Sequence, residues 1–192
     1  MDKVLHISLE YPPHRVIGPL AYTIRDLVTQ LSRYYEIYLI HPADFDGDYM
    51  DGDVRVHAVS DRWFSDVLVY AHYLVSEVSS KAPYIVPRDV VLIHAHDWIP
   101  AMVGRVIAKR LRKPLIVSVY TTEPMRSGGS LSLLSLSITD WERYVLSEAD
   151  HVIAHSRFAL ESLSRDYGIK ASLFNDLSTI LSIYRDVIKP RA

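Results

Sequence analysis

The chain has 192 residues, 49% of them apolar, and a formal net charge of −2. This length and apolar content predict one folded domain with a sizeable core and exclude a disordered segment. The charge balance lacks the basic patch that is typical of nucleic-acid binding. No apolar run reaches the ~20 residues that span a bilayer, so we expect no membrane partner. The chain has no cysteine, which excludes disulfides and thiol catalysis and favours a cytoplasmic protein.

Strands and helices alternate along the chain. Apolar runs bounded by turn residues predict strands at 4–8, 37–40, 54–59, 90–95, 115–120 and 151–155, and a further short strand at 171–174. Apolar residues at helical spacing predict helices at 19–32, 64–78, 101–111, 133–148, 158–167 and 177–189. The alternation predicts the α/β class, as a Rossmann-like open parallel sheet with helices on both faces.

The first connection from strand to helix carries Glu10, Arg15 and Gly18. A glycine before a helix lets an anion approach the free backbone N–H groups, and the helix dipole favours an anion there. Pro19 suits the first helical turn because its missing N–H needs no partner. The dinucleotide pattern GxGxxG is absent, which disfavours NAD. An ordinary helix start is the alternative interpretation of Gly18.

Residues 44–53 hold five aspartates and two glycines. Asp44, Asp46 and Asp48 alternate as in a calcium-binding loop. However, Gly47 comes too early, and Arg55 stands where a bidentate glutamate belongs. We therefore predict a solvated acidic turn.

The run Val90–Ile93 ends abruptly in His94-Ala95-His96-Asp97-Trp98. In open α/β sheets, ligands bind at the carboxyl ends of the strands. Alternate residues of a strand point the same way, so we expect both histidines to face one ligand. This pattern favours recognition of a sugar or phosphate.

Three other interpretations of this stretch remain open. A zinc site needs a third protein ligand, and the sequence offers no partner motif, so we expect no metal. A second interpretation is that one of the two histidines is a structural residue. A third, which is compatible with the second, is that Asp97 caps the helix that starts near Trp98. The remaining histidines are interpreted as structural because they are scattered along the sequence, at His6, His41, His57, His72, His151 and His155.

Residues 121–132 contain Pro124 and Gly128-Gly129 and follow a predicted strand. We expect a mobile loop on the same face as the strand ends. The chain has neither a GxSxG elbow nor a Walker loop, which excludes the usual serine hydrolase and nucleoside triphosphatase patterns.

Five segments together resemble the amino-terminal domain of glycogen and starch synthases and, more widely, retaining GT-B glycosyltransferases. The resemblance extends from Lys3 to about Ile169. Its segments, in chain order, are Glu10-Tyr11-Pro12-Pro13 with Gly18, the helix end Asp26–Leu31, His94–Trp98, Asp140–Arg143 and Glu148–Ser156.

The resemblance implies two Rossmann-like domains that face each other across a cleft. It places Gly18 near the diphosphate of a sugar nucleotide, ADP-glucose or UDP-glucose, and His96 and Asp97 near sugar hydroxyls of an α-glucan acceptor. Glu10, Arg15, His94 and Tyr120 are further candidates for the site. It implies no cofactor beyond the sugar nucleotide and no metal requirement.

The chain departs from the family pattern at three positions. The double glycine of the family is Gly18-Pro19 here, and its nearby lysine falls on Val16. The family usually has a histidine where Tyr120 stands. Tyrosine hydrogen-bonds sugars, but its ordinary pKa of about 10 makes it a poor substitute for imidazole.

After residue 170, where the family enters its second domain, only a short tail follows. We therefore predict a Rossmann-like domain over 1–170 and a tail over 171–192. One helical face of the tail is apolar, as shown by Leu177, Ile180, Leu181, Tyr184 and Ile188. The resemblance implies that this tail is the family's crossover helix, which packs back on the first domain.

The leading hypothesis is thus the acceptor-side half of a glucosyltransferase, inactive alone, whose partner is a separate donor-binding chain or a second copy. The rival hypothesis is a non-catalytic binding or regulatory module derived from the same fold. A flavodoxin-like domain is a third hypothesis, but it leaves His94–Trp98 unexplained.

We also expect exposed apolar surface around Pro12, Trp98 and Tyr120, because a lone half leaves its cleft face open. Finally, Asn175 is the only asparagine and Gln30 the only glutamine, and this scarcity favours a thermophilic source over chance.

Overall fold

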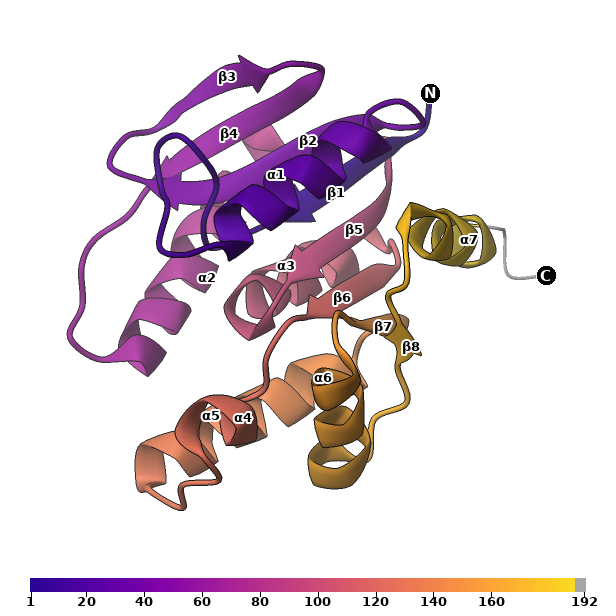
Figure 1. Cartoon of the computed structure of the whole chain (residues 1–192). Coiled ribbons are helices and arrows are strands. Elements are labelled where there is room, and N and C mark those ends of the chain that lie inside the picture. The colour runs from indigo at the N-terminus through magenta and orange to yellow at the C-terminus, as the bar shows by residue number, and fades with distance from the viewer. Residues whose placement is uncertain (189–192) are drawn as a thin grey trace.

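The computed structural model describes residues 1–188, and its centre is one open sheet (Figure 1). The strands lie in the order β3-β4-β2-β1-β5-β6-β7-β8, and every neighbouring pair is parallel except β3 and β4. The strands are β1 Lys3–Ile7, β2 Glu36–Ala43, β3 Gly47–Asp51, β4 Val54–Ser60, β5 Val90–His96, β6 Leu115–Val119, β7 His151–Ala154 and β8 Ser172–Leu173. The predicted α/β class and the Rossmann-like open sheet are confirmed.

Helices cover both faces of this sheet. They are α1 Leu20–Leu31, α2 Val67–Ile85, α3 Trp98–Leu111, α4 Glu123–Ser127, α5 Leu133–Ser147, α6 Arg157–Ser162 and α7 Leu177–Ile188. One apolar core joins α1 and α7 to one face, where Leu92 and Ile116 point. The other core joins α2, α3 and α5 to the opposite face, where Ile93 and Val117 point. Neighbouring residues of a strand thus serve opposite cores, as the pleat requires.

The parallel strands deliver their following loops to one edge of the sheet. The segments after Ile7, His96, Val119 and Ala154 all emerge there, and we call this the carboxyl edge. Ligands of open α/β sheets bind at this edge, so it is where the candidate site is sought.

The acidic segment 44–53 is not simply a solvated turn, as the sequence suggested. Residues Gly47–Asp51 form β3, which pairs antiparallel with β4 in the register Tyr49↔Val56. The interpretation failed because the aspartates and glycines masked the strand alternation. The exposed side chains of this edge strand are Asp48 and Met50, and the charge of Asp48 discourages pairing with other chains.

Three further predicted boundaries are corrected. The segment 121–132 contains the short helix α4 and is not a plain loop. Helix α2 runs to Ile85 rather than 78 and includes Pro83 in its last turn. Helix α6 ends at Ser162 and continues as a π-helical turn over Leu163–Tyr167.

The predicted tail helix is α7, which lies against the same face as α1 (Figure 1). Its buried side chains are Ile180, Ile183 and Tyr184, whereas Leu177, Leu181 and Ile188 are half-buried. The predicted last residue of the helix, Lys189, lies outside the described residues. Within residues 1–188, no helix combines the length and the apolar character needed to cross a bilayer.

Candidate functional site

The loop between β1 and α1 carries its own anion. The Glu10 carboxylate accepts hydrogen bonds from the backbone N–H groups of Ile17 (2.7 Å) and Gly18 (2.8 Å). These are the groups that the sequence assigned to a ligand phosphate. Glu10 is buried, so its negative charge remains close to the start of α1, where the helix dipole favours it. A phosphate can use these N–H groups only when Glu10 moves away.

Arg15 is held by contacts within the protein. Its guanidinium forms an ion pair with Asp61 (2.5 Å) and donates a hydrogen bond to the Tyr70 hydroxyl (3.2 Å). Asp61 follows β4 and Tyr70 lies on α2, so Arg15 fastens the loop to these two elements. The structure therefore places this candidate in a contact that supports the loop.

Asp97 follows β5 directly and has an unusual backbone conformation. Its φ is 65° and its ψ 179°, a region that is accessible almost only to glycine. Its carboxylate makes no capping bond to α3 and instead accepts from the backbone N–H of Tyr120 at 2.9 Å. Burial raises the pKa of Asp97 to about 7. Asp97 thus positions the loop that carries Tyr120.

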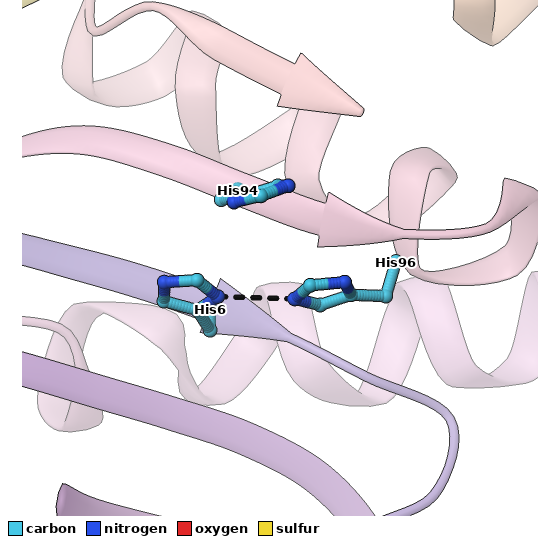
Figure 2. Close-up of side chains that lie close together, drawn as sticks. All are labelled: His6, His94 and His96. Atoms are coloured by element: carbon cyan, nitrogen blue, oxygen red, sulfur yellow. Dashed lines mark hydrogen bonds between the residues drawn. The ribbon is translucent and has the colours of Figure 1, made fainter. Parts of the chain in front are cut away.

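Three histidines meet below the carboxyl edge, on the face that α1 and α7 cover. His94 and His96 point the same way from β5, as predicted, with ring centroids 4.6 Å apart. His6 joins them from β1, where it lies in register with His94 (Figure 2). All three side chains are fully buried or nearly so. The sequence interpreted His6 as one of several scattered structural histidines and did not reveal this neighbourhood, which arises because sheet order places β1 beside β5.

These histidines provide the third imidazole that the sequence did not reveal. One ring nitrogen from each lies within 4.8 Å of the others, which is the spacing of potential metal ligands. Yet each of the six ring nitrogens already has a hydrogen-bond partner in the protein. Moreover, the rings of His94 and His96 are stacked with their planes only 28° apart, so their lone pairs lie in two nearly parallel planes, which disfavours convergence on one metal ion. The donor set therefore fits hydrogen bonding better than metal coordination.

Rings from three elements stack at the carboxyl edge beside this cluster. Tyr120 stacks on His155 with centroids 4.0 Å apart, and His155 stacks on Phe174 at 4.6 Å. His155 and Phe174 also line a cavity of about 220 Å³ between α1 and the start of α7. Its polar walls are Thr23, Asp26 and Gln30.

A larger cavity of about 410 Å³ lies away from this edge. It is on the face that α2 covers, between the end of that helix and strands β2 to β4. His57 pairs with Asp48 there at 2.6 Å. None of the predicted site residues lines this cavity.

Comparison with known proteins places this architecture in a family. Residues 20–174 match the family described as Glycosyltransferase Family 4. The chain belongs to glycosyltransferase family 4. It is 27% identical over 190 residues to an uncharacterized glycosyltransferase of Methanocaldococcus jannaschii, covering 98% of this chain and 47% of that relative. The family 4 chain therefore spans about half the length of the curated relative that it matches.

Solved structures with the same fold include several sugar-transferring enzymes. Sucrose-phosphate synthase from Thermosynechococcus elongatus matches with a TM-score of 0.70 at 12% identity, over 91% of this chain and 47% of that one. A second chain of that synthase matches over 100% of both chains, with a TM-score of 0.65 at 14% identity. Anabaena HepE, in complex with UDP and glucose, matches with a TM-score of 0.58 at 16% identity, over 97% of this chain and 50% of the HepE chain. These likenesses identify the domain as a Rossmann-like half of the GT-B fold.

Sequence reasoning missed several residues of the site. His6 and His155 were interpreted as structural, and Phe174, Ser118 and Tyr184 had no role beyond their elements. Only His155 carried a signal, because it stands at a predicted strand end like His96 and Tyr120. Tyr184 was seen as part of an apolar stripe, and nothing in the sequence places its hydroxyl beside His6.

Proposed function

We propose that this family 4 domain is the acceptor-side half of a retaining glycosyltransferase that moves glucose from a nucleotide sugar to an α-glucan. The observation that carries the proposal is the cavity at the carboxyl edge. Aromatic rings form one side of it, and hydroxyl, carboxylate and amide groups form the other. An apolar ring face with a few convergent polar groups suits a sugar, which has apolar C–H faces and a rim of hydroxyls.

The residues present suit distinct roles in this reaction. Tyr120 and His155 are half-buried at the edge; His155 lines the cavity, and Tyr120 stacks directly on His155 beside it. His96 is buried and reaches a ligand only through Tyr120, whose hydroxyl lies 3.2 Å from its Nδ1. We therefore propose Tyr120 and His155 as contact residues, and His94, His96 and Asp97 as residues that position them.

We infer that the donor side is supplied by a second domain, because the chain spans 47% of its curated relative. Residues 1–170 would then form one half of the cleft, and residues 171–192 would contain the helix that returns to it. Helix α7 docks on the sheet in the manner that such a helix requires. Catalysis by positioning needs both halves, so we expect no turnover from this chain alone. Nucleotide release from ADP-glucose or UDP-glucose with glycogen present is the measurement.

Binding of the acceptor is the direct test of the cavity. Titration with maltoheptaose should show saturable binding that Gln30→Ala weakens about tenfold, which corresponds to about 1.4 kcal/mol. Thr29→Ala is the matched control, because Thr29 is an exposed residue of the same helix outside the cavity lining. Equal weakening by both variants, or no binding by the parent chain, would refute the acceptor site.

A non-catalytic module is the second candidate function, and Glu10 favours it. Its carboxylate occupies the N–H groups that a donor phosphate needs. On this hypothesis, glucan binding persists, but adding a donor-binding domain produces no transfer. A Glu10→Gln variant separates the two functions, because loss of the charge should increase transfer only if Glu10 competes with phosphate.

A further inference from the structure

An unbroken chain of hydrogen bonds runs beneath the carboxyl edge. It starts at Tyr120 Oη and ends at His155 Nε2, and five other side chains lie between them. The links, in order, are Tyr120–His96 (3.2 Å), His96–His6 (3.0 Å, Figure 2), His6–Tyr184 (3.2 Å), Tyr184–His94 (2.6 Å), His94–Ser118 (2.8 Å) and Ser118–His155 (2.9 Å). Its two ends come together at the edge, where Tyr120 and His155 stack.

The central groups of this chain constrain one another. A neutral imidazole has one N–H donor and one acceptor nitrogen, and a tyrosine hydroxyl has one proton to donate. Tyr184 Oη lies between His6 Nε2 and His94 Nδ1 and is fully buried. It satisfies both rings by donating to one and accepting from the other. His6 Nδ1 and His96 Nε2 face each other in the same way, so only one of them carries a proton.

Two arrangements satisfy all these central links. In the first, Tyr120 donates to His96, and His6, His94 and His96 all carry the proton on Nε2. In the second, every bond is reversed, and the same three rings carry the proton on Nδ1. The three histidines therefore change tautomer together, and each arrangement leaves the chain neutral.

We propose that this chain of hydrogen bonds is a proton relay that connects Tyr120 with His155. A proton that arrives at Tyr120 Oη releases the hydroxyl proton to His96 Nδ1. His96 passes its Nε2 proton to His6, His6 passes one to Tyr184, and the shift continues through His94 and Ser118 to His155 Nε2. His155 then releases its Nδ1 proton at the edge. One proton enters and one leaves, each O–H or N–H bond that breaks is replaced, and no charge remains inside.

The surroundings favour transfer through neutral groups. His6, His94 and His96 are at most 1% exposed, whereas Tyr120 and His155 are half-buried at the edge. Burial lowers the pKa of all three inner histidines, to about 3 for His6, which disfavours a resident imidazolium. Concerted exchange avoids that species. The biological role of the relay rests on the proposed function: it gives the proton that an acceptor hydroxyl releases a path away from Tyr120.

The relay also explains why a tyrosine stands at position 184. Its hydroxyl is the only group that α7 contributes to the chain of hydrogen bonds, and it joins His6 of β1 to His94 of β5. Phenylalanine would fill the same space in the apolar core but would separate the path into two halves. Tyr35 offers a matched comparison, because its ring contacts that of Tyr184 at 5.4 Å and it is no member of the path.

The test is nuclear magnetic resonance of the chain labelled with ¹⁵N at histidine, at pH 7 and without ligand. Two-bond ¹H–¹⁵N correlations report the tautomer of each ring, and relaxation dispersion reports exchange between tautomers. We expect equal tautomer fractions and one shared exchange rate for His6, His94 and His96. Mixed tautomers, or one tautomer without detectable exchange, would overturn the relay.

The variant Tyr184→Phe should abolish the shared rate and leave His6 and His94 with different tautomer fractions. Tyr35→Phe should keep both properties of the parent chain. Unchanged coupling in Tyr184→Phe would contradict the proposal, and the parent spectrum still decides the question if that variant does not fold.

The last experiment adds stoichiometric Zn²⁺ to the parent chain and repeats the measurement. Loss of exchange with shifted ring nitrogens would show that the three histidines form a metal site instead. No arm requires glycosyl transfer, so failure of the proposed function leaves this result intact.

Discussion

At the scale of single residues, Asp97 combines two costs that a purely structural residue avoids. Its backbone lies in a region that disfavours side chains, and its carboxylate is held where ionisation is disfavoured. The bond to the Tyr120 N–H offsets part of this cost. Strained conformations of this kind cluster at functional sites, where the surrounding structure maintains them.

Two variants separate the backbone cost from the side-chain contribution. Asp97→Ala and Asp97→Gly both lose the bond to Tyr120, but only glycine relieves the positive φ. We expect Asp97→Gly to be more stable than Asp97→Ala by about 1–3 kcal/mol in urea unfolding. Equal stabilities would show that the residue is not strained.

Buried histidines determine how stability depends on pH. Burial lowers the pKa of His6 to about 3 and that of His41 and His155 to about 4, whereas the unfolded value is about 6.5. Below pH 6.5 the unfolded chain therefore binds more protons than the folded chain, and stability falls. His6 alone contributes a loss of roughly 2 kcal/mol at pH 5 relative to pH 7.5.

Asp97 acts in the opposite direction, because its raised pKa lets the folded chain hold a proton between about pH 4 and 7. The histidines outnumber it, so the free energy of unfolding should be lower at pH 5 than at pH 7.5. Urea titrations at the two pH values measure this difference. Greater stability at pH 5 would mean that Asp97 outweighs the histidines.

Part of the site was predictable at this scale because of strand geometry. The period of two placed His94 and His96 on one side of β5, and the strand end located Tyr120. The partners His6 and Tyr184 were not predictable, since sheet order and helix docking bring them together across 90 and 178 residues. The positive φ of Asp97 was also not predictable, because its residue type does not specify this backbone conformation.

At the scale of elements, α7 shows what an apolar stripe does and does not reveal. The pattern predicted the helix and its docking on the domain. The buried face, however, centres on Ile180, Ile183 and Tyr184, about one position away from Leu181 and Leu177. Periodicity fixes a face only within a fraction of a turn, and packing against α1 and β5 selects the final orientation.

Ile180 is fully buried between α7 and the sheet, so shortening it should leave a cavity. We expect Ile180→Ala to destabilise the chain by about 2–5 kcal/mol. Ser182→Ala, on the exposed side of the same helix, should change stability by less than about 0.5 kcal/mol. Thermal unfolding of both variants measures the contrast. A small effect at Ile180 would indicate that α7 docks loosely.

At the scale of the whole molecule, the exposed apolar side chains are not those that the sequence singled out, although several lie in segments that follow strands β1 and β6. Pro12 and Trp98 are buried and Tyr120 is half-buried. The large exposed apolar residues include Ile17, Trp63, Leu131 and Leu133, which lie in loops and at the start of α5. The sequence predicted that an open half would expose apolar surface, but it could not separate rings that stack on their neighbours from side chains that remain free.

Replacement of Leu131 and Leu133 by serine should reduce self-association without a loss of stability. Both side chains are more than 80% exposed, so they contribute little to the fold. Light scattering over a concentration series should show weaker association for the double variant. Tyr84→Ser, which changes an equally exposed residue at the end of α2, is the control and should match the parent chain. Unaltered association in the double variant would exclude this surface as the contact.

The contact between His6 and Tyr184 also constrains the order of folding. Strand β1 is synthesised before α7, so the hydroxyl that completes its buried histidine follows 178 residues later. Until then, the rings of β1 and β5 need water or one another as partners, so the nascent sheet remains open on the α7 side. Contacts of such long sequence separation are slow to form, because the chain between them must be ordered first. Docking of α7 on the sheet should therefore be a late step in the folding of this domain, and a folding intermediate would carry solvated histidines that become dry only when α7 docks.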